Sequence, residues 1–147
     1  MGGLEKSLIF FLTNYYPRDT LLTSTTNIGG HMALTIYTTY MQDWHNGEAE
    51  PLSTHVTERG AKRRLIDYMF SQLAGWADWG SNDEIGTWID ETLATFKCEY
   101  DEYWSKVKNL DDDDVQELFT TVYDYTDQWL DSGHGTWFTF ASFELEG

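Results

Sequence analysis

Residues 78–131 combine dense negative charge with many aromatic side chains, and this combination constrains the fold more than any other feature of the chain. The segment contains sixteen acidic residues, three lysines, four Trp, four Tyr and two Phe. Acidic disordered segments are usually poor in aromatic residues, because they cannot bury enough apolar surface to offset the entropy of ordering. We therefore expect this segment to fold, with its aromatic side chains in a core and its carboxylates on an ordered surface.

The strand signals lie at the two ends of the acidic domain. Residues 34–41 are rich in β-branched and aromatic side chains, and residues 51–56 suit a second strand. Residues 45–48 contain Asn-Gly, which is typical of a tight hairpin turn. Residues 136–145 alternate between apolar and polar side chains, as a final strand does. The pattern predicts a small antiparallel sheet made of an N-terminal hairpin and a C-terminal strand.

Three helices are predicted between these strands. The first begins at Thr57 as the N-cap, the second spans residues 82–106, and the third opens at residues 109–111, with a loop over residues 75–81. Their apolar faces are, in order, Ala61, Leu65, Ile66, Met69, Phe70 and Leu73; Ile85, Trp88, Ile89, Leu93, Phe96, Tyr100, Tyr103 and Trp104; and Val115, Leu118, Phe119, Val122, Tyr125, Trp129 and Leu130. Strands at both ends with about three helices between them predict an α+β fold with an acidic outer helical face.

Residues 1–31 differ from the remainder, because they hold two acids and two bases while the net charge of −16 comes from residues 32–147. Two interpretations stay open for them. They are an upstream extension of the protein, or a non-native leader that precedes a start at Met32, since Gly-Gly shortly before a Met is also what a translated ribosome-binding site yields. In both cases we expect residues 32–147 to form a single acidic α+β domain.

The charge and the motifs exclude several classes of function. A net charge of −16 repels nucleic acid and anionic membranes, so neither is an expected partner. We find no nucleophile elbow, phosphate loop, zinc signature or catalytic triad, and no EF-hand pattern in the Asp run. The sequence therefore predicts a protein that is not an enzyme and needs no metal or cofactor. Cys98, the single cysteine, is expected to be a small buried hydrophobe.

The candidate binding residues are carboxylates on the second and third helices. At about 100° per residue, the acids of the third helix share the side opposite its apolar face. Part of the Asp111–Asp114 run also suits capping of a helix N-terminus, and an acidic face that is merely solvated is the alternative to a binding surface. The predicted partner-binding residues are Asp90, Glu91, Asp101, Glu102, Asp111, Asp112, Asp113, Asp114, Glu117, Asp124, Asp127 and Asp131.

Four bases cluster at the start of the first helix, at Arg59, Lys62, Arg63 and Arg64. Positive charge is unfavourable there because of the helix dipole. We expect these bases to pair with the protein's own acids. A contact with the acidic face of a second copy, which would give a homodimer, is the alternative.

The segment Leu34-Thr35-Ile36-Tyr37-Thr38-Thr39-Tyr40, followed by Trp44-His45-Asn46-Gly47, resembles the opening strand and aromatic-Asn-Gly turn of ArdA-type antirestriction proteins. The acidic chain as a whole resembles the small phage- and plasmid-encoded inhibitors that mimic DNA, which include several anti-CRISPR proteins. The resemblance implies a non-catalytic inhibitor in the cytoplasm of a bacterial host. Its partner would be a basic DNA-binding protein, a defence nuclease complex of a restriction or CRISPR system, whose DNA groove it occupies.

Two other functions are compatible with the composition. An acidic adaptor would bind a basic protein surface that is not a DNA groove, and competition with DNA separates it from a mimic. A salt-adapted globular protein would carry acids over its whole surface. The concentration of sixteen of the 25 acids in residues 78–131 argues against the latter.

Overall fold

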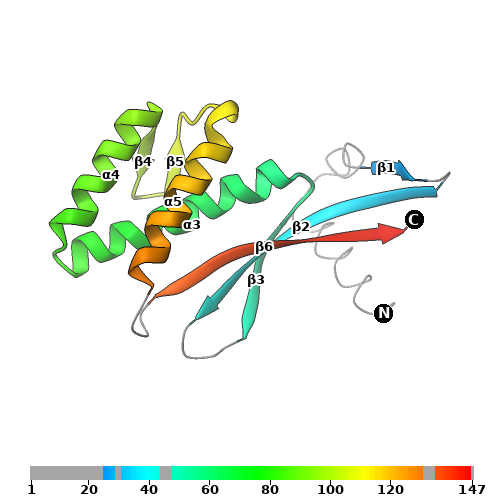
Figure 1. The fold of residues 1–147 in the computed structure, drawn as a ribbon, viewed down its shortest axis with the longest axis horizontal. Coiled ribbons are helices and arrows are strands. Elements are labelled where there is room, and N and C mark those ends of the chain that lie inside the picture. Colours follow the sequence, from blue (N-terminus) through cyan, green and yellow to red (C-terminus); the bar gives the residue numbers. More distant parts are fainter. Residues whose placement is uncertain (1–24, 29–30, 44–47, 131–134, 147) are drawn as a thin grey trace.

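The computed structural model describes residues 25–28, 31–43, 48–130 and 135–146. Figure 1 shows a layer of helices from which a long sheet projects. The elements are β1 (Thr25–Ile28), β2 (His31–Asp43), β3 (Ala49–His55), α3 (Glu58–Trp79), α4 (Asp83–Phe96), β4 (Glu99–Asp101), β5 (Lys106–Lys108), the 3₁₀ turn η1 (Asp112–Asp114), α5 (Val115–Trp129) and β6 (Thr136–Glu146). The fold is α+β, as predicted.

The larger sheet is antiparallel and is organised around β2. This strand pairs with β3, with β6 and with β1, and its register with β6 runs from Ala33 opposite Glu146 to Asp43 opposite Thr136. The predicted N-terminal hairpin and C-terminal strand are thus confirmed. Residues 45–47 of the predicted hairpin turn lie outside the described ranges. Strand β1, which we did not predict, pairs with the first residues of β2.

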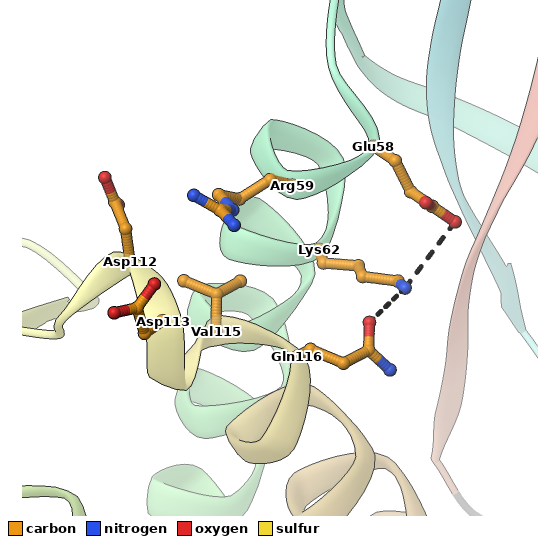
Figure 2. A pocket seen from close by; sticks show the side chains of 7 residues that line it. All are labelled: Glu58, Arg59, Lys62, Asp112, Asp113, Val115 and Gln116. Atoms are coloured by element: carbon orange, nitrogen blue, oxygen red, sulfur yellow. Dashed lines mark hydrogen bonds and ion pairs between the residues drawn. The ribbon is translucent and has the colours of Figure 1, made fainter.

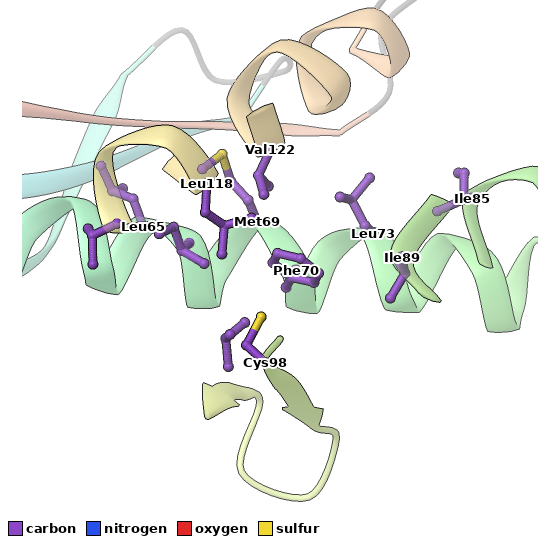
Figure 3. Packing of buried hydrophobic residues seen from close by; sticks show 12 residues of the cluster. Leu65, Met69, Phe70, Leu73, Ile85, Ile89, Cys98, Leu118 and Val122 are labelled. Carbon is purple, nitrogen blue, oxygen red and sulfur yellow. The ribbon is translucent and has the colours of Figure 1, made fainter. Parts of the chain in front are cut away.

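The main core is built on α3. All six apolar side chains predicted for this helix are buried, and its N-cap is Thr57, whose Oγ1 accepts a hydrogen bond from the Gly60 N–H at 2.9 Å. Figure 3 shows Leu118 and Val122 of α5 on one side of α3 and Cys98 on the other, with Ile85 and Ile89 of α4 farther along the helix. Helices α4 and α5 therefore both pack on α3. Cys98 is buried, as expected.

The predicted loop over residues 75–81 is wrong, because α3 continues through Gly75 to Trp79. Trp76 packs against the core, which offsets the weak helix propensity of a glycine one residue earlier. The helix ends at Gly80, whose N–H donates to the carbonyl oxygen of Trp76 at 3.0 Å. A single glycine therefore does not end a helix that is buried along one side.

The predicted second helix is also wrong beyond residue 96. Lys97 adopts a left-handed conformation with φ of 55°, and the Cys98 N–H then bonds back to the carbonyl oxygen of Leu93 at 3.0 Å. Strands β4 and β5 follow as a short hairpin in which Tyr100 lies opposite the buried Val107. Tyr103 and Trp104, which we assigned to a buried stripe, are 84% and 65% exposed at its tip.

Asp67 ties this hairpin to α3 from within the core. Its side chain is buried, and Oδ1 accepts a hydrogen bond from the Val107 N–H at 2.9 Å. Arg64 lies 3.6 Å from Oδ2. Burial raises the pKa of this carboxyl, against the opposing effects of the Val107 hydrogen bond and the nearby cations. The Val107 hydrogen bond and the nearby cations therefore offset part of the cost of burying this carboxyl group.

We expect Asp67→Ala to lower the free energy of unfolding by about 1–3 kcal/mol, because it leaves the buried Val107 N–H without its acceptor. Asp67→Asn should cost clearly less, since its amide oxygen can accept the same bond. Urea unfolding of both variants checks this. Equal losses in the two variants would contradict a role for Asp67 as the acceptor.

His55 gives the fold a pH-dependent element. Its Nε2 lies 2.8 Å from the Ser53 Oγ, which lies 2.5 Å from the Thr39 Oγ1. Burial, and secondly the positive charge of Arg64, lower the pKa of His55 to about 4. Because the unfolded ring titrates at about 6.5, the unfolded state binds more protons between these values. Stability contributed by this site is thus lost as pH falls from 6.5 to about 4.

We expect His55→Gln to remove this component, because glutamine does not titrate. Between pH 7 and pH 4.5, the wild-type protein should lose roughly 1–2 kcal/mol more unfolding free energy than the variant, an amount that allows for partial exposure of the ring. Chemical denaturation at the two pH values measures the difference. Identical pH slopes would show that the ring is protonated as readily in the folded protein as in the unfolded chain.

Candidate functional site

A groove runs between α4 and α5. It consists of two adjoining cavities of about 380 and 290 Å³, which share Trp88 and Glu91. The Trp88 ring on α4 and the Tyr125 ring on α5 stack across it, with centroids 3.9 Å apart and an interplanar angle of 1°. The remaining lining residues are Asp83, Glu84, Thr87, Thr92, Thr95, Phe96, Glu117 and Thr121. The two helices therefore contact each other through stacked aromatic rings that belong to the groove.

The lining of the groove is strongly acidic. Asp83, Glu84, Glu91 and Glu117 are all exposed, and in the described part of the chain none of them belongs to an ion pair. No Lys, Arg or His is found among the described residues that line the two cavities. In Tyr125, burial of the phenol and, to a lesser extent, the Glu84 charge raise the hydroxyl pKa. The groove therefore presents negative charge without an internal counterion.

Local sequence explains why the carboxylates face the groove. Asn82 caps α4, and its Oδ1 accepts from the N–H groups of Glu84 and Ile85 at 3.1 and 3.3 Å. Ile85 and Ile89 are buried on the α3 side. Residues 84, 88, 91 and 95 then share a second side of the helix, because they are three or four positions apart. The apolar and the acidic sides of α4 are set by the same periodicity.

The structure brings together only some of the predicted binding residues. Glu91 and Glu117 line the groove, and Asp124 is exposed two turns after Glu117 on the same side of α5. Asp90 is exposed but does not line it. Asp127 lines a small cavity with Trp137 and Phe138 of β6, away from α4, and Asp131 lies outside the described residues.

Two further predicted residues lie on the β4–β5 hairpin rather than on a helix. Asp101 contacts Lys108 at 2.6 Å and accepts hydrogen bonds from the N–H groups of Tyr103 and Trp104 at 3.0 and 3.4 Å. These contacts, above all the one with Lys108, lower the pKa of the Asp101 carboxyl. Glu102 is exposed in the turn. Asp101 therefore has a structural role in the turn.

The residues of the Asp111–Asp114 run have different roles: one caps a helical turn and two line another cavity. Asp111 accepts a hydrogen bond from the Asp113 N–H at 3.0 Å, which confirms the capping interpretation for this residue. Asp114 is half-buried and makes no side-chain cap. Figure 2 shows Asp112 and Asp113 at a cavity of about 250 Å³, which they share with Arg59 and Lys62. Cations thus face this part of the acidic run.

The basic cluster is largely used inside the protein. Lys62 lies 3.5 Å from Glu58 and also donates to the Gln116 side chain, as Figure 2 shows. Arg64 pairs with Asp67, and Arg63 donates to the carbonyl oxygen of Val107. The expected pairing with the protein's own acids is confirmed for Lys62 and Arg64.

Sequence reasoning left Asp83 and Glu84 out of the candidate site. The signal that could have found them is the N-cap at Asn82, because it places both acids in the first turn of α4 and fixes which side Glu84 occupies. Acids in a first turn are also favoured by the helix dipole alone, so their position by itself does not indicate a binding site.

The described residues offer no metal centre and no membrane-spanning helix. Among them, no group of three or more His, Cys, Asp or Glu is arranged to hold a metal ion. None of the described helices is both long and apolar enough to cross a membrane. Ser53 and His55 are hydrogen-bonded, but neither lines the groove between α4 and α5.

Comparison of this chain with protein-family models, with curated proteins and with solved structures finds no match. The resemblance to ArdA-type and other DNA-mimicking inhibitors therefore stays a prediction from the sequence.

We expect the groove carboxylates to repel one another measurably. At low salt, the stabilisations by Glu91→Gln and by Glu117→Gln should add up to a few tenths of a kcal/mol more than that of the double variant, because either single substitution already removes the repulsion. This comparison cancels the loss of Glu117 from the first turn of α5. The difference should vanish near 1 M salt, where the screening length is about 3 Å. Thermal unfolding of the three variants measures it. Additive effects at low salt would show that Glu91 and Glu117 do not interact across the groove.

Proposed function

We propose that this protein is a non-catalytic acidic inhibitor that mimics DNA and occupies the nucleic-acid-binding groove of a host defence nuclease. The observation that supports this most is the pair of acidic helices on either side of one groove, with no described cation in its lining. Duplex DNA also presents two rows of negative charge with a groove between them. A surface that binds DNA through Lys and Arg would find the same sign and arrangement of charge here.

The spacing within each row supports the same proposal. Glu84 and Glu91 are seven residues apart on α4, as Glu117 and Asp124 are on α5, which corresponds to about 10.5 Å along each helix. Phosphates of one DNA strand advance about 3.4 Å per nucleotide, so each interval matches about three nucleotides. Each row therefore carries a sparser charge than DNA, at an interval close to three nucleotide steps.

The proposed mechanism is competitive occupancy. The negative field steers the protein toward a basic groove, which gives fast association that weakens as salt rises. The charges are held on helices packed against a common core, so binding does not need to order them first. Apolar contacts made at close range would then set the dissociation rate.

A cleavage assay tests this proposal. A panel of purified restriction and CRISPR nucleases is mixed with labelled target DNA and increasing amounts of the protein. We expect at least one nuclease to be inhibited, with inhibition relieved by non-specific duplex DNA and weakened by higher salt. The variant Glu91→Gln/Glu117→Gln should inhibit at least tenfold less well, whereas Asp90→Asn/Glu144→Gln should stay within about twofold of wild type.

Two results would contradict the proposal. One is a partner that binds the protein equally well in the presence of excess duplex DNA, which is the behaviour of an acidic adaptor. The other is equal loss of inhibition in the groove variant and its charge-matched control, which would mean that net charge alone, and not the groove, is responsible.

A further inference from the structure

An aromatic pocket lies at the end of α3, outside the acidic groove. It has a volume of about 270 Å³ and is lined by Trp76 and Trp79 of α3, Ile85 of α4 and Trp129 of α5, together with Gly75, Gly80 and Asn82. Trp79 is 93% exposed, the highest exposure among the large hydrophobic side chains that the structure describes. Trp79 therefore contributes little to the core, and with the other rings of the pocket it offers an aromatic surface of the kind that anchors partners at interfaces.

This aromatic pocket adjoins the groove at the first turn of α4, although the two cavities share no lining residue. Asn82 and Ile85 line the pocket while Asp83 and Glu84, on the same first turn of α4, line the adjoining cavity of the groove. On the other side, the Trp129 ring of the pocket lies 6.1 Å from the Tyr125 ring of the groove, measured between centroids. The aromatic pocket and the groove are therefore neighbours, and together they form a path with Trp79 at one end and Glu117 at the other.

We propose that this path binds one extended, basic segment of the partner protein, with a single large apolar side chain of that segment in the aromatic pocket. This inference rests on the proposed function and deepens it, because it names the part of the partner that enters the groove. The occupant must be cationic, since four exposed carboxylates and no described cation line the groove. It must also be apolar at one end, since three tryptophans and an isoleucine meet there.

The length of the path fits a short peptide segment. Helix α4 has 14 residues, or about 21 Å at 1.5 Å per residue. An extended chain covers this length with six or seven residues at about 3.3 Å each. Lys or Arg side chains along it would reach the carboxylates of both rows.

A second copy of this chain is a poor occupant. Its basic cluster at residues 59–64 lies within α3, so it is not extended. Lys62 and Arg64 are already paired with carboxylates, and Arg63 donates to the backbone of Val107. Strand β5 (Lys106–Lys108) is extended and basic, but it has only three residues, Val107 between its lysines is buried, and Lys108 pairs with Asp101. The described part of the chain therefore offers a partner copy no extended basic segment as long as the path.

The probes for the test are synthetic eight-residue peptides of Lys and Arg. Two of them carry one leucine, near either end, and matched peptides carry glycine at that position. Affinity for the full chain is measured by calorimetry. We expect one leucine peptide to bind about tenfold more tightly than its glycine match, because the leucine is removed from water in the aromatic pocket.

The variant Trp79→Ala should reduce this preference to less than about threefold, with little change in affinity for the glycine peptides. Trp104→Ala removes another exposed tryptophan, on the β4–β5 hairpin and outside the path, and should keep the preference. Both variants should unfold near the wild-type temperature. Equal affinity for leucine and glycine peptides, a preference that survives Trp79→Ala, or no binding by any peptide would overturn the inference.

These outcomes are separate from those of the proposed function. Competition with duplex DNA tests the acidic groove, and the leucine preference tests the aromatic pocket. A protein that inhibits a nuclease in competition with DNA, yet shows no leucine preference, would keep the proposed function and lose this inference.

Discussion

Burial of one face of α3 is the constraint on which the rest of the structure depends. The helix carries Leu65, Ile66, Met69, Phe70 and Leu73 fully out of water, and α4, α5 and the β4–β5 hairpin all supply side chains to the same core. At roughly 1.5–3 kcal/mol for each large side chain, this burial is the main favourable contribution to folding here. Because α4 and α5 both use α3 as their support, they lie beside one another with a groove between them.

The described cations and the groove acids are kept apart in this fold. Cations form ion pairs outside the groove: Lys108 pairs with Asp101 in the hairpin, and Lys62 pairs with Glu58 at the start of α3. The acids of the groove are left without such partners in the described residues, although each unneutralised carboxylate adds to the repulsion within the protein. This uneven distribution supports a binding role for the groove, because solvation alone does not require acids to be gathered around aromatic rings.

The part of the site that periodicity controls was predictable. Glu91 and Glu117 were expected on the surface of amphipathic helices, and both are there. Asp101 and Glu102 were assigned to a helix because Phe96, Tyr100 and Tyr103 repeat at helical spacing. The contrary signal was the alternation in the hairpin, where Glu99 lies opposite Lys108 and Asp101 opposite Lys106. Cross-strand pairs of opposite charge are typical of antiparallel strands. Together with the left-handed turn at Lys97, they favour a hairpin here over a continued helix.

The sequence by itself determined the class of fold, the stripe that α3 buries, the strands β2, β3 and β6, and the negative sign of the surface, because these follow from local periodicity and from composition. Only the tertiary structure decided which carboxylates meet. Glu91 and Glu117 are 26 positions apart and come together because both helices pack on α3, whereas Asp127 is turned toward β6. Tertiary packing likewise left Trp79 exposed while it placed Trp88 against Tyr125. Sequence spacing fixes the side of a helix on which a residue lies, but the neighbour on that side depends on how separate elements pack.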